Sequence, residues 1–208
     1  MANANRPRGL VPKFHLNGSA WNGASRVYSI VASYANQISI GDPVVSSGTA
    51  DSNGVPGIAV LGAAGSGAAS GAIRGVVIGL SKSQAITANP SNLDITYRPA
   101  SDPVIWYAAV VDDPSVVFEV QEQSNGTALA ATEAGLNTVL YAPTTDPKYL
   151  SAWQVASASG ATPATTYSLQ VRLLGLNQVP GNSFGAYAKW LVLINVHELG
   201  QGTGAAGV

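Results

Sequence analysis

The chain has 208 residues, of which 46% are hydrophobic and none is cysteine, so it can bury a core as one domain or two small lobes but cannot form disulfides or thiolate metal sites. Only 10% of the residues are Asp, Glu, Lys or Arg, against about 25% in an ordinary globular protein, and the formal net charge is −1. Such a surface opposes association weakly, which favours a component of an assembly; the alternative is an ordinary surface on which Ala, Gly, Ser and Thr replace charges.

The first 24 residues predict an extended N-terminal arm. Proline and glycine interrupt regular structure there, and scattered apolar side chains can act as anchors. The arm is purely basic, because Arg6, Arg8, Lys13 and Arg26 all precede the first acidic residue, Asp42. Neither the opening MANANRPRGLVPKF nor any later segment holds an apolar run of membrane-spanning length, so the sequence predicts neither a secreted precursor nor a membrane protein.

Residues 25–200 predict a mainly β domain, with two small lobes as one option. Short runs rich in Val, Ile, Tyr and Leu are separated by Gly, Pro, Asn and Asp, as in RVYSIVA, IRGVVIGL and VIWYAAVV. In VVFEVQE and YSLQVRLL, apolar and polar side chains alternate, which places one face inward and the other toward solvent or a partner. WLVLINV is apolar on both faces and predicts a central strand. We therefore expect an antiparallel β-sandwich or barrel, jelly-roll-like, with at most one short helix.

One segment has helical character: TALAATEAGLN is rich in alanine, with Thr127 as a candidate N-cap and Gly135 near its end. The Gly, Ala and Ser tract LGAAGSGAASGA has no apolar periodicity and predicts a loop. Residues 201–208 predict a flexible glycine-rich tail.

The middle of the chain is purely acidic, because no Lys or Arg lies between Asp102 and Asp146. Two of its members, Asp112 and Asp113, could in principle bind a hard cation, but they lie in DDPS, which is ordinary turn chemistry. We assign no metal site. A candidate acidic surface for a partner is formed by Asp112, Asp113, Glu119 and Glu122.

Two catalytic or nucleotide-binding patterns occur, and their context argues against both. GTGAAG matches G-x-G-x-x-G at Gly202, Gly204 and Gly207, but no helix follows to hold a pyrophosphate. GNSFG matches the nucleophile elbow around Ser183, yet it precedes a predicted strand rather than a helix, and only His15 and His197 could act as bases. We expect no enzyme activity, no catalytic residues and no cofactor.

Two binding functions are also weakly supported. The basic residues are few and lack an interleaved aromatic pattern, so we expect no nucleic-acid binding. A carbohydrate-binding β-sandwich remains an alternative, but it needs exposed aromatic side chains. Trp106 and Trp190 lie in predicted strands, which leaves Trp21 and Trp153 as candidates.

Several segments together resemble structural proteins of tailed-bacteriophage heads. They are MANANRPRGLVPKFHLNGSAWNG, IGDPVVSSGTADSNGVPGIAV followed by IRGVVIG, VVDDPSVVFEVQEQSNGTALAATEAGLN, and NSFGAYAKWLVLINVHELG. The resemblance implies a decoration or cement subunit, made in the bacterial host cytoplasm, that lies on the outer surface of the capsid. Its partners would be the phage major capsid protein and further copies of itself, as a homotrimer in preference to a homodimer. A tail or fibre component is the closest alternative.

Decoration proteins of this kind clamp neighbouring capsomers, and the arm suits that task. An extended segment can add a strand to an exposed sheet edge of the coat protein or contact a neighbouring subunit. In the alternative, the arm folds back over its own β core. We also expect a chain truncated through Trp21 to fold, because the predicted strands lie beyond it. The residues expected to bind the capsid or another partner are Arg6, Arg8, Leu10, Lys13, Phe14, Leu16 and Trp21.

Overall fold

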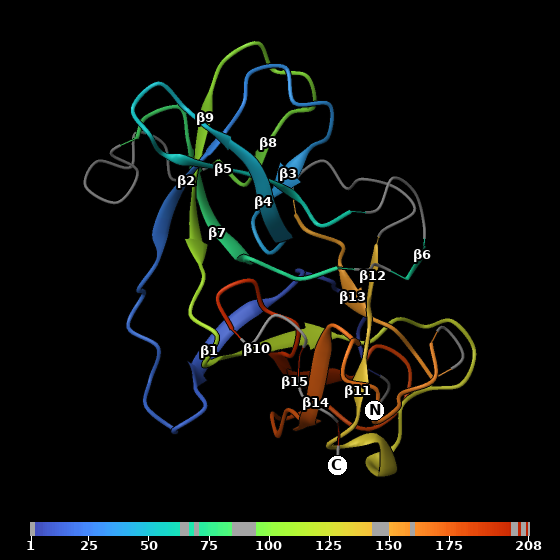
Figure 1. Ribbon diagram of the computed structural model, residues 1–208. Coiled ribbons are helices and arrows are strands. Elements are labelled where there is room, and N and C mark those ends of the chain that lie inside the picture. Colours follow the sequence, from blue (N-terminus) through green and yellow to red (C-terminus); the bar gives the residue numbers. More distant parts are fainter. Residues whose placement is uncertain are drawn as a thin grey trace.

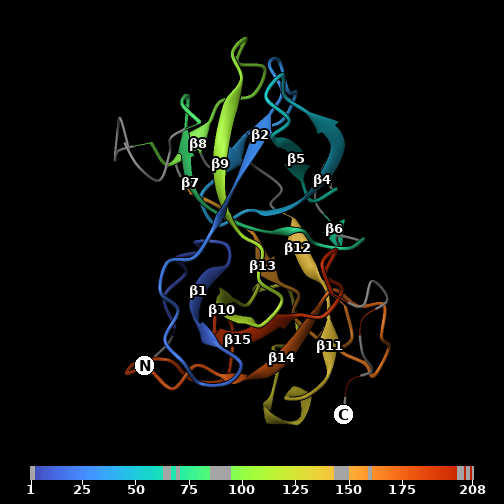
Figure 2. The ribbon, with the colours of Figure 1, turned by 60° about the vertical axis from the view of Figure 1, so that its left-hand side comes forward.

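A computed structural model describes residues 3–62, 67–68, 71–84, 95–142, 150–158 and 161–200, together with Gly204 and Gly207. Within them the chain is mainly β, with antiparallel pairing dominating and a single short helical turn. The predicted class, an antiparallel β-sandwich or barrel-like fold, is confirmed. Two lobes lie one above the other, a barrel and a sheet lobe (Figures 1 and 2).

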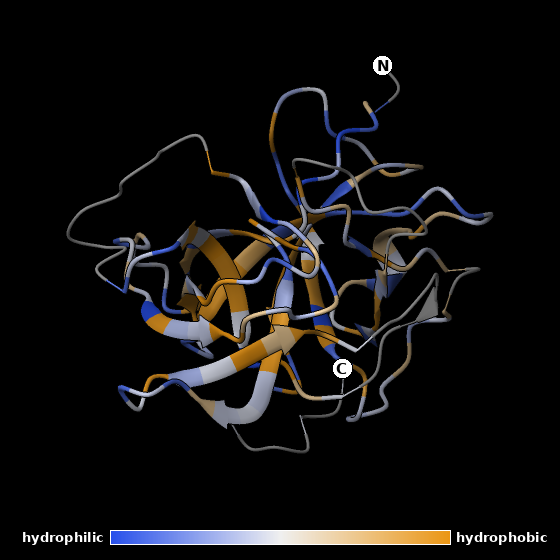
Figure 3. Cartoon of the chain, turned by 90° about the horizontal axis from the view of Figure 1, so that it is seen from above, coloured by the Kyte–Doolittle hydropathy of each residue, from blue (hydrophilic) through white to orange (hydrophobic). Residues whose placement is uncertain are grey.

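The upper lobe is a closed barrel in which five strands follow the order β2-β5-β4-β7-β9. Every pair is antiparallel except β2 and β5, which meet in parallel at Ser29 and Gly57. Seen from above in Figure 3, hydrophobic residues gather along these strands. Their inward side chains, among them Ile30, Val77 and Val110, are fully buried and form a core of their own. The strand bounds are β2 (Arg26–Ile30), β4 (Pro43–Ala50), β5 (Pro56–Val60), β7 (Gly75–Ser81) and β9 (Trp106–Val111).

The lower lobe is built on a five-stranded antiparallel sheet of order β1-β10-β15-β14-β11. The central strand is β15, which pairs with β10 on one edge and with β14 on the other. It contains the WLVLI run, so the predicted central strand is confirmed. The bounds are β1 (Val11–His15), β10 (Val116–Gln121), β15 (Lys189–Ile194), β14 (Val171–Leu176) and β11 (Asn137–Thr138).

Smaller elements close the two lobes. A three-stranded sheet of order β13-β12-β6 lies beside the five-stranded sheet, and β3 pairs with β8 at the barrel. The predicted helix is reduced to one turn of 3-10 helix, and its N-cap is Ala130 rather than Thr127, because the Ala130 amide donates to the Glu133 carboxylate at 2.6 Å. The bounds are β3 (Ile38–Ser39), β6 (Gly67–Ala68), β8 (Tyr97–Arg98), η1 (Ala131–Glu133), β12 (Leu140–Ala142) and β13 (Gln154–Val155).

The arm folds back on its own core, which was the alternative to an outward-reaching strand. β1 pairs with β10 along one edge of the sheet, and the chain then turns so that Ala20 bridges to Phe14. Leu10, just before β1, is 1% exposed and belongs to the lower core together with Ile73, which precedes β7, and Val111 at the end of the barrel strand β9. The arm therefore ties the two lobes together.

One expectation about exposure is corrected. On β10, the face predicted to point toward solvent or a partner is largely covered: Val117 is fully buried and Gln121 is 4% exposed. Residues of the arm cover Gln121, which accepts the Arg6 amide at 2.8 Å and donates to Asn5 at 2.9 Å. In the predicted flexible tail, Gly207 is buried and its amide donates to Thr165 at 3.1 Å, while the rest of 201–208 apart from Gly204 lies outside the described residues.

Candidate partner-binding face

The arm crosses the junction between the lobes at a point where two backbones touch. A side chain on Gly9 would lie 2.2 Å from the Gly41 carbonyl oxygen, and one on Gly41 would lie 2.1 Å from the Arg8 carbonyl oxygen. Both glycines have positive φ, 66° and 97°, so both space and conformation require glycine here. The Leu10 amide donates to the Gly41 carbonyl at 2.9 Å. This crossing fixes where the basic side chains on either side of it lie.

Four cations gather where the arm lies on the sheet. Arg6, Arg8, Lys13 and Lys189 line one cavity of about 230 Å³. Lys189 begins the central strand β15, opposite Gln121 of β10 in the register. The sequence predicted three of these cations as a group but not Lys189, because its neighbours along the chain are apolar.

One carboxylate, Glu119 of β10, serves this cluster. It lies 3.1 Å from the Lys13 ammonium and 3.9 Å from that of Lys189, and it also accepts a hydrogen bond from the Asn177 amide. Among the described residues, the exposed guanidinium groups of Arg6 and Arg8 form no ion pair. The cavity thus carries a positive excess that can receive an anionic group of a partner.

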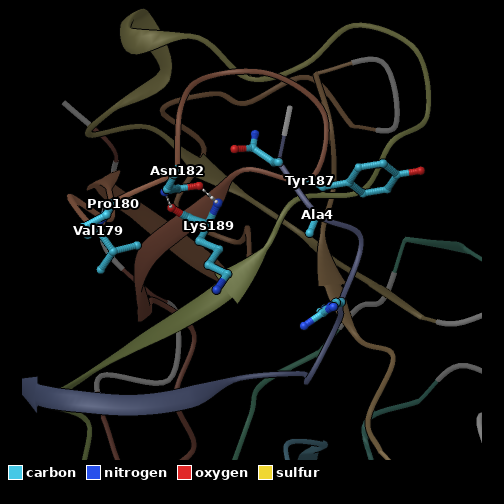
Figure 4. A pocket seen from close by; sticks show the side chains of 9 residues that line it. Ala4, Val179, Pro180, Asn182, Tyr187 and Lys189 are labelled. Atoms are coloured by element: carbon cyan, nitrogen blue, oxygen red, sulfur yellow. Dashed lines mark hydrogen bonds between the residues drawn. The ribbon is translucent and has the colours of Figure 1, made fainter. Parts of the chain in front are cut away.

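A second cavity of about 240 Å³ adjoins the first and shares Arg6 and Lys189 with it. Figure 4 shows Asn182, in the loop that precedes β15, beside Lys189 at the start of that strand. The Asn182 side-chain oxygen accepts a hydrogen bond from the Lys189 backbone amide at 2.9 Å, and its side-chain nitrogen donates to the Lys189 carbonyl at 2.9 Å. Asn3 fixes the same loop from the arm, since it donates to the carbonyls of Ser183 and Ala186. The wall of this cavity is therefore built by paired amides rather than by a loose loop.

A third cavity of about 330 Å³ lies on the other side and shares Arg8 and Val11 with the cationic cavity. Its lining is mostly apolar and comes from both lobes, with Leu10 from the arm, Ile40 and Ile78 from the barrel, and Leu150. Leu150 is 45% exposed. An apolar side chain of a partner would gain by covering it.

The remaining residues expected in the arm have different environments. Phe14 is half-buried in β1, and Trp21 is half-buried against the lower core. Leu16 is 56% exposed at the turn that follows β1. Leu10 is an internal anchor, so of the predicted apolar contacts only Leu16 is freely available to a partner.

The expected acidic surface does not form. Glu122 is fully buried and Asp112 is 7% exposed, so neither can face a partner. Asp112 accepts the Tyr28 hydroxyl at 2.6 Å and lies 3.5 Å from the Arg26 guanidinium. Burial, followed by this hydrogen bond, raises the pKa of Tyr28. Asp112 and Glu122 therefore form hydrogen bonds inside the fold and do not contribute to an acidic surface.

The two outer members of that set are engaged within the chain. Glu119 belongs to the cationic cavity described above. Asp113 is the exposed one: it accepts the Ser115 amide at 2.8 Å and lies 3.4 Å from the His15 ring, and the hydrogen bond from the Ser115 amide lowers the pKa of its carboxyl. This is the turn predicted for DDPS.

The elbow-like motif lies in a loop that leads to strand β15, as predicted. Ser183 is exposed, and its backbone exchanges hydrogen bonds with Asn3. Of the two histidines, His15 contacts Ser115 and Asp113, while His197 is 2% exposed and its Nδ1 accepts the Leu199 amide at 3.0 Å. Burial lowers the pKa of His197.

The nucleotide-binding match, metal sites, membrane spans and candidate sugar platforms have the following outcomes. Gly202 of the G-x-G-x-x-G match lies outside the described residues. Where the structure describes the chain, no three His, Cys, Asp or Glu side chains are placed to hold a metal ion, and no helix is long and apolar enough to cross a membrane. Trp153, a candidate sugar platform, is 3% exposed and packs in the lower core, whereas Trp106 and Trp190 are buried as predicted.

Comparison with known proteins found no matching family model, no matching curated protein and no matching solved structure.

Proposed function

We propose that the chain is a virion structural protein, a decoration or cement subunit on the outer surface of a tailed-phage head, that binds the major capsid protein through its cationic face. The observation that carries the proposal is the gathering of Arg6, Arg8, Lys13 and Lys189 around one carboxylate, in a chain whose net charge is only −1. Unpaired charge on an otherwise charge-poor surface supports binding to an oppositely charged partner. The resemblance of the sequence to phage head proteins names that partner.

The ordered arm suits a cement protein for a physical reason. A binding face whose backbone is already fixed by β1 and by the crossing at Gly9 loses less conformational entropy when it binds than a free arm does. Clamping neighbouring capsomers requires more than one such face. A symmetric oligomer provides several copies and gains from their combined binding.

We expect purified protein to be a homo-oligomer, a trimer in preference to a dimer, because a charge-poor surface opposes association weakly. Light scattering coupled to size-exclusion chromatography measures the mass directly. A monodisperse species of 21.1 kDa, the mass of one chain, at micromolar concentration would contradict the expectation.

Charge removal on the cationic face is expected to weaken attachment to capsids. The double variant Arg6→Gln with Arg8→Gln should bind undecorated heads of the same phage about tenfold more weakly or worse, because neutral glutamine offers no positive charge to the coat protein. The matched control, Arg26→Gln with Lys82→Gln, also removes two positive charges, but from the barrel, and should bind like the wild type. Co-sedimentation over a protein concentration series gives the affinities.

Salt and folding controls complete this test. Wild-type binding should weaken toward 1 M salt, where the Debye length is about 3 Å, and the Arg6, Arg8 variant should depend less on salt. Circular dichroism should show both variants to be folded like the wild type. Equal capsid occupancy by the Arg6, Arg8 variant and the Arg26, Lys82 control would contradict the proposed attachment face.

Truncation through Trp21 would not test attachment by itself, and the expectation that the truncated chain folds has to be revised. It would remove β1 from the sheet and Leu10 from the lower core, so loss of attachment would be confounded with loss of folding. Substituting exposed charges leaves both in place.

A further inference from the structure

The three cavities adjoin one another through shared lining residues and differ in character. The cationic cavity is in the middle; it shares Arg8 and Val11 with the apolar cavity on one side, and Arg6 and Lys189 with the polar cavity on the other. We call these three cavities together the groove. Its order is therefore apolar, cationic, polar, and the arm provides lining residues throughout.

The walls of the groove are preformed. The Asn182 amide fixes the start of β15, Asn3 fixes the neighbouring loop, and the Gly9 and Gly41 backbones touch between the cationic and apolar parts. These contacts hold Arg6 and Arg8 on a backbone that is already ordered. A ligand that fits the groove does not have to order it first.

We propose that the groove binds an extended acidic peptide segment, with an apolar side chain of that peptide in the cavity lined by Leu150 and its carboxylates at Arg8, Arg6 and Lys189. The inference rests on the proposed function in taking the peptide to be part of a virion partner. A polypeptide offers both parts of this pattern along one extended backbone, because its carboxylates satisfy the guanidinium groups and an aliphatic side chain satisfies the apolar cavity.

A nucleic acid fits the groove less well. Tight binding to phosphate backbones commonly uses about 6–10 contacts, whereas the groove offers four cations, two of which share Glu119. A phosphate chain also has nothing to place against Ile40, Ile78 and Leu150. The acidic peptide is thus the occupant that uses the whole groove.

The test uses short synthetic probes and the full chain. The first probe is the fluorescein-labelled peptide Gly-Leu-Glu-Asp-Glu-Asp-Gly, made in both chain directions. In the second probe serine replaces the leucine, in the third Gln and Asn replace the acids, and the fourth is an oligothymidylate of matched length. Fluorescence anisotropy should show saturable binding of the first probe below about 1 mM. We expect the second and third probes to bind about tenfold more weakly or worse.

Variants locate the contact on the chain. Leu150→Ser should weaken the leucine probe about tenfold but leave the serine probe unchanged, because only the leucine side chain reaches that cavity. The control Leu199→Ser alters a leucine that is similarly exposed, 41% against 45%, and should change neither. Arg8→Gln should weaken both acidic probes and leave the neutral one unchanged.

Each contrary result overturns the inference. It fails if the leucine probe does not saturate, if the leucine and serine probes bind equally, if Leu150→Ser weakens both alike, or if oligothymidylate binds more tightly than the acidic peptide. Its failure is separable from that of the proposed function. If the probe binds but the protein does not attach to capsids, the capsid role is rejected and peptide binding in the groove is retained. If the protein attaches to capsids but does not bind the probe, peptide binding is rejected and the capsid role is retained.

Discussion

Replacing Arg98 by methionine is expected to lower the free energy of unfolding by about 2–5 kcal/mol. Arg98 is fully buried, and its guanidinium group donates to five backbone carbonyls, at distances from 2.8 to 3.4 Å. Methionine fills similar space but donates no hydrogen bond. The carbonyls of Val31, Tyr34 and Asp102 each keep a backbone amide donor, whereas those of Asn36 and Pro99 lose the donor that Arg98 provides.

The expected loss reflects how Arg98 joins two loops at one end of the barrel. The loops also bond directly, through the Ser33 amide to Asp102 and the Ser101 amide to Tyr34, and both serines have positive φ. Urea unfolding followed by tryptophan fluorescence measures the change. Arg26→Met is the control, because that side chain is 68% exposed and should cost no more than about 1 kcal/mol. A loss below about 1 kcal/mol for Arg98→Met would contradict the structural role of its hydrogen bonds.

Glu122 is expected to make the protein less stable as the pH rises from about 4.5 to about 7. Burial raises the pKa of its carboxyl to about 7, against hydrogen bonds from the Leu129 amide and the Trp190 indole that lower it. The folded chain therefore holds a proton that the unfolded chain releases near its ordinary value of 4.5. Stability is full below that value and falls by about 3 kcal/mol once the folded carboxyl has also ionised.

The variant Glu122→Gln isolates this effect, because an amide does not titrate. It gives up one of the two hydrogen bonds, which lowers stability by a similar amount at every pH. His197 titrates in an overlapping range with the opposite sign, since its lowered pKa adds stability as the pH rises. The quantity to measure is therefore the difference in unfolding free energy between wild type and variant from pH 5 to pH 8. A difference that does not change over this range would refute the raised pKa.

The strands could be predicted because buried strands consist of short runs of apolar or alternating residues. RVYSI, WYAAVV and WLVLI form β2, β9 and β15 as expected. What the pattern could not give is which strands pair, since β1 meets β10 and β2 meets β9 across long stretches of chain. The division into a barrel and a sheet lobe follows from this pairing. The predicted helix is a single turn in the structure, Ala131–Glu133, and β11 begins four residues after it.

The candidate site was predictable in part. Arg6, Arg8 and Lys13 were identified as one basic group, and the structure adds Lys189 because the register of β10 and β15 places it beside Gln121. The acidic set failed for a related reason. Charge along a sequence carries no information on depth. The sequence therefore predicts Glu122, which directly follows the buried strand β10, as a surface residue, whereas it is fully buried and accepts a hydrogen bond from the Trp190 indole at 3.0 Å.

The pairing of the arm with β10 also sets the order in which the molecule can be made. Arg6 bonds to Gln121, a separation of 115 residues. At translation rates of about 5–20 residues per second, the arm leaves the ribosome roughly 6–23 seconds before its partner strand exists. The barrel strands, all within 26–111, are complete before β10 is synthesised. The nascent chain thus holds all the barrel strands and a basic arm that still lacks its partner strand, and the groove forms only when β15 has joined the sheet.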